Sequence, residues 1–202
     1  MKILGITGPS GAGKSRLSDK FRQMNIPVID ADEVYHSLLI PPSDCLTAIR
    51  SIFGNEIFDE TGALCREKLA GIVFNDKEKL KLLNKTVLPF VLDKIRYIIS
   101  SLDREIVVVD APTLIESGFD KECDAVISVL CPKEIRLQRI MTRDGITREY
   151  ALERIKAQKP DSFYVERSDA VIINDADDEK ITETLVPLLD KLFPELSMEE
   201  GI

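Results

Sequence analysis

The sequence predicts an α/β fold in which helices flank a five-stranded parallel sheet. Three observations lead to this prediction. Short β-branched runs alternate with longer helical patterns over much of the 202-residue chain, which implies right-handed βαβ crossovers. The run Ile106–Asp110 has the composition of a strand buried on both faces of a parallel sheet. A glycine-rich turn joins the first strand pattern to the first helix pattern. The length suits one domain of ordinary size.

Each predicted strand is a short apolar run. In chain order these runs are Lys2–Thr7, Pro27–Ile29, Ile106–Asp110, Ala125–Leu130 and Ala170–Ile173. Helical patterns are expected beside them at Ser15–Met24, Lys133–Arg143, Arg148–Gln158 and Asp178–Leu192.

Between Asp32 and Glu105 the alternation stops, and the segment is mostly helical. Helices are expected at Glu33–Leu39, Ser43–Phe53, Arg66–Phe74 and Lys77–Ser100, the last with a kink at Pro89. About seventy residues of helix are too many for a simple crossover between two strands. We therefore expect a helical subdomain over the carboxyl edge of the sheet, where ligands of such sheets bind.

The eight residues from Gly8 to Ser15 read G-P-S-G-A-G-K-S, a complete G-x-x-x-x-G-K-[ST] phosphate loop. Its glycines let the chain turn and let a phosphate approach without a side chain in the way. The strand, turn and helix direct several backbone N–H groups into one concavity at the positive end of a helix dipole. Lys14 can reach the β- and γ-phosphates, and the Ser15 hydroxyl can ligate Mg²⁺. The chain is therefore predicted to bind a nucleoside triphosphate.

Two aspartates stand at strand ends on the same edge of the sheet as the loop. Asp32 follows the second strand, and a carboxylate there can orient an acceptor hydroxyl and take its proton during phosphoryl transfer. Asp110 ends the most hydrophobic strand and can hold the water shell of Mg²⁺. Each has a structural alternative as a helix N-cap, Asp110 for the short helix at Thr113. For Asp30 a capping role is an equally open interpretation.

Arg136, Arg139 and Arg143 recur at helical spacing and so share one helix face. Planar guanidinium groups suit phosphate oxygens and the charge that spreads over a transferring phosphoryl group. Gly145 supplies a hinge before the next helix, so the two helices are expected to form a mobile lid that closes its arginines over the reaction. For any single arginine here, a solvated helix face is an equally open alternative.

Charge and cysteine content argue against several other classes of protein. The formal net charge of −8 argues against broad binding to nucleic acid or anionic membranes. No apolar run approaches the ~18 residues of a membrane span, and the first residues do not resemble a signal peptide. The four cysteines form no C-x-x-C pair and are expected to be reduced thiols in a cytoplasmic protein.

Together these landmarks resemble the dephospho-CoA kinase family, from about Lys2 to Ala176. The phosphate loop is shared by many kinases. The more specific blocks are I-D-A-D-E at Ile29–Glu33 and R-D-G-I-T-R-E-Y-A-L-E-R-I-K-A-Q at Arg143–Gln158. Two further blocks, F-G-N-E-I-F-D-E-T-G-A-L and V-V-V-D-A-P-T-L-I-E-S-G-F-D, are similar to segments of the family. The chain departs from the family at Leu88-Pro89, where His-Pro is usual.

The resemblance implies a P-loop kinase fold and ATP-dependent phosphorylation, with Mg²⁺, of the ribose 3′-hydroxyl of dephospho-CoA. It implies a core of residues 1–31, 101–135 and 168–202, a CoA-binding insertion of residues 32–100 and a lid of residues 136–167. The predicted catalytic residues are Lys14, Asp32 and Arg143, and the predicted metal ligands are Ser15 and Asp110. The residues predicted to bind nucleotide are Gly11, Ala12, Gly13, Lys14, Ser15, Arg16 and, near the adenine, Asn174.

Two other functions remain open at this point. The loop also resembles that of uridine kinases, so the acceptor could be a nucleoside or another small alcohol. A nucleotide switch would need a guanine-reading N-K-x-D string, and Asn84-Lys85-Thr86-Val87 lacks its aspartate and lies in a predicted helix. The expected partners are ATP and dephospho-CoA, without nucleic acid or membrane, and the protein is expected to be a monomer.

Overall fold

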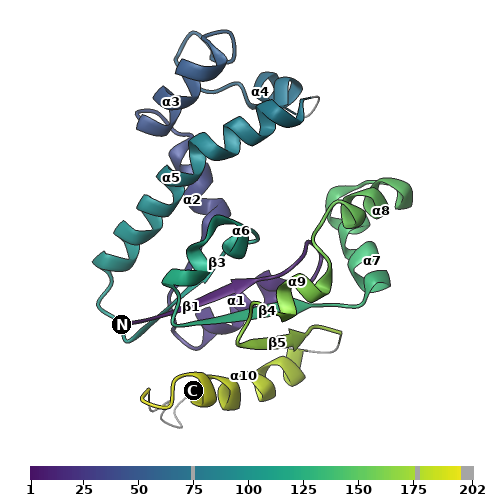
Figure 1. The fold of residues 1–202 in the computed structure, drawn as a ribbon. Helices are drawn as coiled ribbons and strands as arrows, with labels where there is room; N and C mark the ends of the chain where they lie inside the picture. Colours follow the sequence, from purple (N-terminus) through teal and green to yellow (C-terminus); the bar gives the residue numbers. More distant parts are fainter. Residues whose placement is uncertain (74–75, 176–177, 197–202) are drawn as a thin grey trace. The chain divides into compact units, whose positions relative to one another are not determined.

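A computed structural model describes residues 1–73, 76–175 and 178–196 (Figure 1). Within these residues one five-stranded sheet has the order β2-β3-β1-β4-β5, with parallel pairing of β3 to β1, β1 to β4 and β4 to β5. The strands are β1 (Lys2–Thr7), β2 (Val28–Asp30), β3 (Ile106–Asp110), β4 (Ala125–Leu130) and β5 (Ala170–Ile173). Four of them match the predicted bounds, and β2 begins and ends one residue later than predicted. The predicted α/β fold class is therefore confirmed.

Two helices, α1 (Lys14–Gln23) and α10 (Asp178–Leu192), cover one face of the sheet. Leu17 and Phe21 of α1 are buried in one cluster with Leu185 and Leu189 of α10 and with alternate strand residues such as Ile6. Figure 1 shows α10 running along the sheet beneath β5. Successive side chains of a strand point to opposite faces of the sheet, so every second strand residue contributes to this cluster.

Short helical segments cover part of the opposite face. They are α6 (Leu114–Ser117), the 3₁₀ turn η1 (Phe119–Glu122) and α9 (Asp161–Val165). A Cβ on Gly5 of β1 would lie 2.5 Å from Leu114 Cδ2, so the close approach of α6 requires glycine there. The sequence pattern predicts neither η1 nor α9, because each covers little more than one helical turn.

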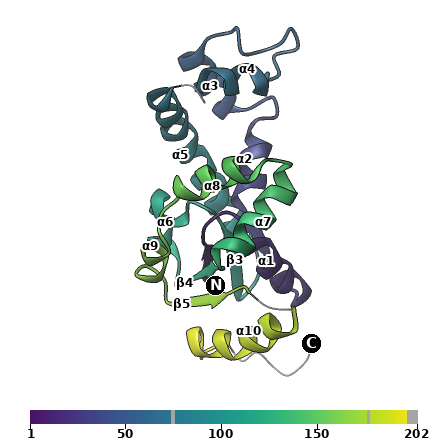
Figure 2. The ribbon, with the colours of Figure 1, turned by 90° about the vertical axis from the view of Figure 1, so that its right-hand side faces the viewer.

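A helical hairpin is built from α7 (Lys133–Asp144) and α8 (Arg148–Lys156), which lie side by side (Figure 2). Gly145 ends α7 with φ of 63°, a left-handed conformation that favours glycine. Leu137 and Ile140 of α7 pack on Ala151 of α8 and form a small core of their own. The hairpin thus has its own packing, as a lid needs.

The chain divides into two compact units, Ile29–Leu102 and the remainder. The first contains α2 (Ala31–Leu38), α3 (Asp44–Phe53), α4 (Arg66–Val73) and α5 (Lys77–Ser101). The three shorter helices each pack on α5, which buries Val87, Val91 and Ile95 at helical spacing and is continuous through Pro89. The predicted end of the helix before α5, at Phe74, lies outside the described residues. No helix in the described part of the chain is long and apolar enough to cross a membrane.

Candidate active site

The phosphate loop follows β1 and leads directly into α1. Gly8, Gly11 and Gly13 all have positive φ, and a Cβ on Gly13 would lie 2.0 Å from the Asn174 amide nitrogen. Only glycine fits such a backbone at so short a distance. Among the described residues no side chain caps α1, and its first turn contains no acidic residue. A helix that starts in this way favours an anion at its positive end.

Side chains of three distant residues and of Lys14 in the loop itself hold the carbonyl groups of the loop. The Arg136 Nε donates to the Ser10 carbonyl oxygen at 3.2 Å, and Arg139 Nη1 donates to that of Ala12 at 3.2 Å. Asn174 Nδ2 donates to the same Ala12 oxygen at 2.8 Å, and Lys14 Nζ donates to the Gly8 oxygen at 2.9 Å. The contacts of Arg136, Arg139 and Asn174 hold the loop from segments far from it in the sequence.

The fixed carbonyl groups determine where the loop directs its N–H groups. In a trans peptide the C=O of one residue and the N–H of the next point in opposite directions. The carbonyls of Ser10 and Ala12 are held from outside, so the N–H groups of Gly11 and Gly13 point the other way. The loop therefore has the backbone arrangement that phosphate binding requires.

Asn174 follows β5 and is only 1% exposed. Its amide nitrogen binds the loop carbonyl of Ala12, and its Oδ1 accepts a hydrogen bond from Arg16 Nη1 at 3.1 Å. The resemblance leads us to expect Asn174 near the adenine. In the structure its polar atoms contact the loop and the first turn of α1, so it supports the loop. Its role toward the base stays a prediction.

Two of the three expected lid arginines donate hydrogen bonds to carbonyl groups of the loop. Arg136 is 5% exposed, and its Nη2 donates to Gln158 Oε1 at 2.6 Å while its Nη1 pairs with Asp161 at 3.4 Å. Arg139 Nη1 contacts two loop carbonyls and lies 3.4 Å from Cys131 Sγ. In this structure their guanidinium groups hydrogen-bond to the loop backbone, and their closure over the phosphates stays a prediction.

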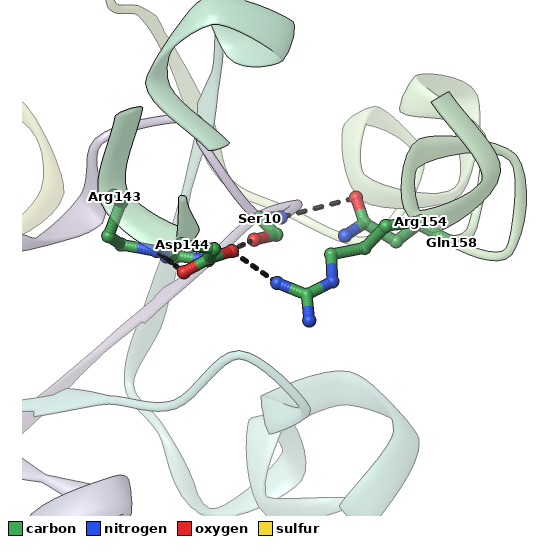
Figure 3. Close-up of polar contacts among 5 residues, drawn as sticks. All are labelled: Ser10, Arg143, Asp144, Arg154 and Gln158. Carbon is green, nitrogen blue, oxygen red and sulfur yellow. Dashed lines mark hydrogen bonds and ion pairs between the residues drawn. The ribbon is translucent and has the colours of Figure 1, made fainter. Parts of the chain in front are cut away.

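Arg143 is different, because its side chain is 58% exposed and lies at the loop (Figure 3). Its Nη2 donates to Ser10 Oγ at 3.2 Å, and its Nε donates to Asp144 Oδ1 at 2.8 Å. Arg154 of α8 pairs with Asp144 as well. The hydrogen bond from Arg143 is the largest cause that lowers the pKa of Asp144. No local sequence pattern assigns an individual role to Ser10, Asp144, Arg154 or Gln158.

Asp110, the last residue of β3, pairs in register with Ile6, the last residue but one of β1. It is 6% exposed, and it accepts a hydrogen bond from Ser18 Oγ at 2.6 Å. Ser18 is three residues after Ser15 on α1, so both serines share one helix face. The N-cap residue of α6 is Thr113, and the Asp110 carboxylate contacts α1.

Asp30 and Asp32 lie in the compact unit Ile29–Leu102, at the start of α2. The Asp30 side chain accepts hydrogen bonds from the backbone N–H groups of Asp32 at 2.8 Å and Glu33 at 3.2 Å. Asp30 is thus the N-cap of α2, which confirms the capping interpretation for Asp30 and excludes it for Asp32. The Asp32 side chain is exposed in the first turn of the helix.

The sheet order, the phosphate loop and the uncapped start of α1 define a P-loop kinase. Shikimate kinase from Acinetobacter baumannii shares this fold, with a TM-score of 0.55, 15% identity and coverage of 96% of this chain and 94% of that one. A sequence model of the dephospho-CoA kinase family matches residues 2–180. The chain belongs to the dephospho-CoA kinase family.

Individual relatives agree with this assignment. Dephospho-CoA kinase from Geobacillus kaustophilus is 39% identical over 189 residues, covering 92% of this chain and 94% of the relative. A crystal structure from Thermus thermophilus superposes with a TM-score of 0.80 at 31% identity, covering 95% and 97% of the two chains. Dephospho-CoA kinase from Campylobacter jejuni superposes with a TM-score of 0.71 at 27% identity, covering 97% and 100%.

The function is ATP-dependent phosphorylation of the ribose 3′-hydroxyl of dephospho-CoA, the last step of coenzyme A biosynthesis. The sequence-based prediction of this activity is confirmed. The alternative acceptor, a nucleoside or another small alcohol, is not favoured.

Proposed function

We propose that Lys14, Asp32 and Arg143 perform the transfer of the γ-phosphoryl group from ATP to dephospho-CoA. The main support for this proposal is the backbone conformation of the loop. Side chains of distant residues bind the carbonyl groups of Ser10 and Ala12, so the N–H groups of the residues that follow point in the opposite direction. Residues 11–16 bind the ATP phosphates through these N–H groups and through Lys14. Positioning and charge stabilisation then supply most of the catalysis.

Mg²⁺ is proposed to bind at Ser15 and Asp110. Both supply oxygen ligands, which Mg²⁺ prefers, and a protein commonly holds this ion through one or two such groups together with substrate phosphates. The bond from Ser18 to Asp110 supports the pairing, because Ser18 lies one turn after Ser15 on α1. When bound, the ion neutralises charge on the β- and γ-phosphates.

Asp32 is proposed to accept the proton of the 3′-hydroxyl. In the same turn Asp30 already caps the helix, so the carboxylate of Asp32 is not needed for the fold of α2. An exposed carboxylate can orient a hydroxyl and act as a general base at neutral pH. Residues 32–100 are proposed to bind the CoA part of the acceptor.

The remaining proposals concern the lid, the base and the state of the protein. Residues 136–167 form a lid that brings Arg143 to the transferred phosphate, and Asn174 lies near the adenine. The enzyme acts as a monomer in the cytoplasm, without nucleic acid or membrane. The free thiols of Cys45, Cys65, Cys123 and Cys131 support that location.

A coupled assay of ADP release with purified protein, ATP, Mg²⁺ and dephospho-CoA tests these roles. Lys14→Ala and Asp32→Asn are each expected to lower kcat by about 10²-fold or more, because each removes a group that acts on the transferring phosphoryl or its acceptor. Far-ultraviolet circular dichroism is expected to match that of the unsubstituted enzyme.

Glu33→Gln is the matched control for Asp32→Asn. Glu33 is the next residue of α2, is also exposed, and carries the same charge. It is expected to leave kcat within about twofold, since a surface substitution of this kind changes little. If Asp32→Asn turned over as fast as Glu33→Gln, Asp32 would have no role in proton transfer. Uridine in place of dephospho-CoA is expected to accept no phosphate.

A further inference from the structure

One face of α8 is turned toward Ser10 of the phosphate loop (Figure 3). The backbone N–H of Ser10 donates to Gln158 Oε1 at 3.2 Å, just after the end of the helix. Arg154 is in the last turn of α8, and its side chain extends toward the same region as that of Gln158 (Figure 3). This face of the hairpin therefore brings one amide and one guanidinium group to the side of the loop where Arg143 also lies.

Arg143 and Arg154 share a single carboxylate, that of Asp144. Arg143 donates from Nε to Oδ1 at 2.8 Å and from Nη2 to Oδ2 at 3.0 Å, while Arg154 Nη1 contacts the same Oδ2. Arg143 Nη2 also donates to Ser10 Oγ at 3.2 Å. One acidic side chain thus gathers two guanidinium groups at a residue of the phosphate loop.

The second arginine is not needed to hold the hairpin together. The side chains of Arg143 and Arg154 are 58% and 48% exposed, and exposed ion pairs add little to stability. The apolar core around Leu137, Ile140 and Ala151 already joins α7 to α8. The two guanidinium groups and one carboxylate also leave one positive charge in excess beside the loop.

We propose that Arg154 is a second phosphate-binding arginine, which together with Arg143 binds the terminal phosphoryl group of ATP. Asp144 holds both guanidinium groups until the nucleotide arrives. A phosphoryl group offers three oxygens and more charge than a carboxylate, so it forms stronger charge-assisted hydrogen bonds to the same two guanidinium groups. The inference rests on the proposed position of ATP in the loop.

Calorimetric titration of Arg154→Gln with ATP and with ADP tests the proposal, in the absence of dephospho-CoA. The dissociation constant for ATP is expected to rise about 10-fold or more, the effect of losing a charge-assisted hydrogen bond. The dissociation constant for ADP is expected to change less than about twofold, because ADP lacks the terminal phosphoryl group.

Arg148→Gln is the matched control. Arg148 lies on the same helix, is 53% exposed and makes one exposed ion pair, with Glu134. Its removal changes the net charge equally and is expected to leave both dissociation constants within about twofold. If Arg154→Gln behaved like Arg148→Gln, or weakened ATP and ADP equally, Arg154 would not bind the terminal phosphoryl group.

Asp144→Asn tests the part assigned to the carboxylate. Because the charged carboxylate competes with the phosphoryl group for both arginines, its removal is expected to tighten ATP binding about twofold to tenfold and to leave ADP binding unchanged. Weaker or unchanged ATP binding would overturn the competition and make Asp144 a support for Arg143.

These titrations separate the inference from the proposed catalytic roles. Kinase activity of the unsubstituted enzyme is measured in parallel, with dephospho-CoA as acceptor. A protein that binds ATP but transfers no phosphate would contradict the catalytic roles, and the comparison of ATP with ADP would still decide the role of Arg154.

Discussion

Asn174 offers a direct test of how the phosphate loop is supported. Asn174→Ala removes the hydrogen bonds to the carbonyl oxygens of Ala12 at 2.8 Å and Gly13 at 3.4 Å, and the bond accepted from Arg16 at 3.1 Å. The Ala12 oxygen keeps its bond from Arg139, and the Gly13 oxygen keeps one from the backbone N–H of Arg16. Neither carbonyl is therefore left without a partner.

The cost of this change should accordingly be that of lost hydrogen bonds and not that of unsatisfied buried groups. At about 0.5–1.5 kcal/mol for each of the two shorter bonds, Asn174→Ala should lower the free energy of unfolding by about 2 kcal/mol. A chain of this length loses about 2–4 °C of Tm per kcal/mol, so Tm should fall by about 4–8 °C. Scanning calorimetry without nucleotide measures this shift.

Asn174→Asp separates the donor of the amide from its acceptor. A carboxylate at this position can still accept from Arg16 but cannot donate to Ala12, whose carbonyl oxygen would then face a negative charge. At pH 8 this variant should be less stable than Asn174→Ala. The deficit should shrink as the pH falls, because a protonated carboxyl can donate again. An aspartate variant as stable as the unsubstituted protein at pH 8 would refute the support role.

Three further outcomes are expected. Gly13→Ala should lower the free energy of unfolding, measured with urea, by about 2 kcal/mol more than Gly145→Ala does. Both glycines have positive φ, but of the two only Gly13 has a neighbour within 3 Å of the added Cβ, so only there does a steric clash add to the backbone strain. Arg136→Met should lower the free energy of unfolding by about 3 kcal/mol, since it removes the hydrogen bonds from a buried guanidinium group to the Ser10 carbonyl oxygen and Gln158 Oε1; an unchanged urea midpoint would contradict this. Burial is the main cause that raises the pKa of Cys123 from 9.0 to about 12, and the charge of Asp120 is the next. The free energy of unfolding should therefore fall as the pH rises from 9 toward 12, and Cys123→Ala should reduce that fall.

The strands were predictable because their signal is local. Ile106–Asp110 and Ala125–Leu130 are short, mainly apolar runs typical of strands buried on both faces of a sheet, and their bounds are confirmed. The segment Asp161–Val165 shows the limit of this approach, because five residues give no helical period. Its first residue, Asp161, is acidic, which favours a helix N-terminus but is a weak signal by itself.

The support of the loop could not be predicted in the same way. Asn174 contacts the loop because β5 pairs with β4 in a register that sets Ile173 beside Leu130, and no local pattern reveals a register. The spacing of the arginines on α7 shows which of them share a face. It does not show which face meets the loop, because that depends on the packing of α7 against α8. The sequence therefore shows which residues can bind phosphate or a metal ion, but it does not show which residues they hydrogen-bond to in the fold.

The start of α1 has a practical consequence for solution work. Without a side-chain cap among the described residues and with no acidic residue in its first turn, this helix end should attract small oxyanions as well as nucleotides. Inorganic phosphate and sulfate should raise the melting temperature in proportion to the logarithm of their concentration, and should compete with ATP. Kinetic constants measured in phosphate buffer should therefore differ from those measured in a buffer without oxyanions.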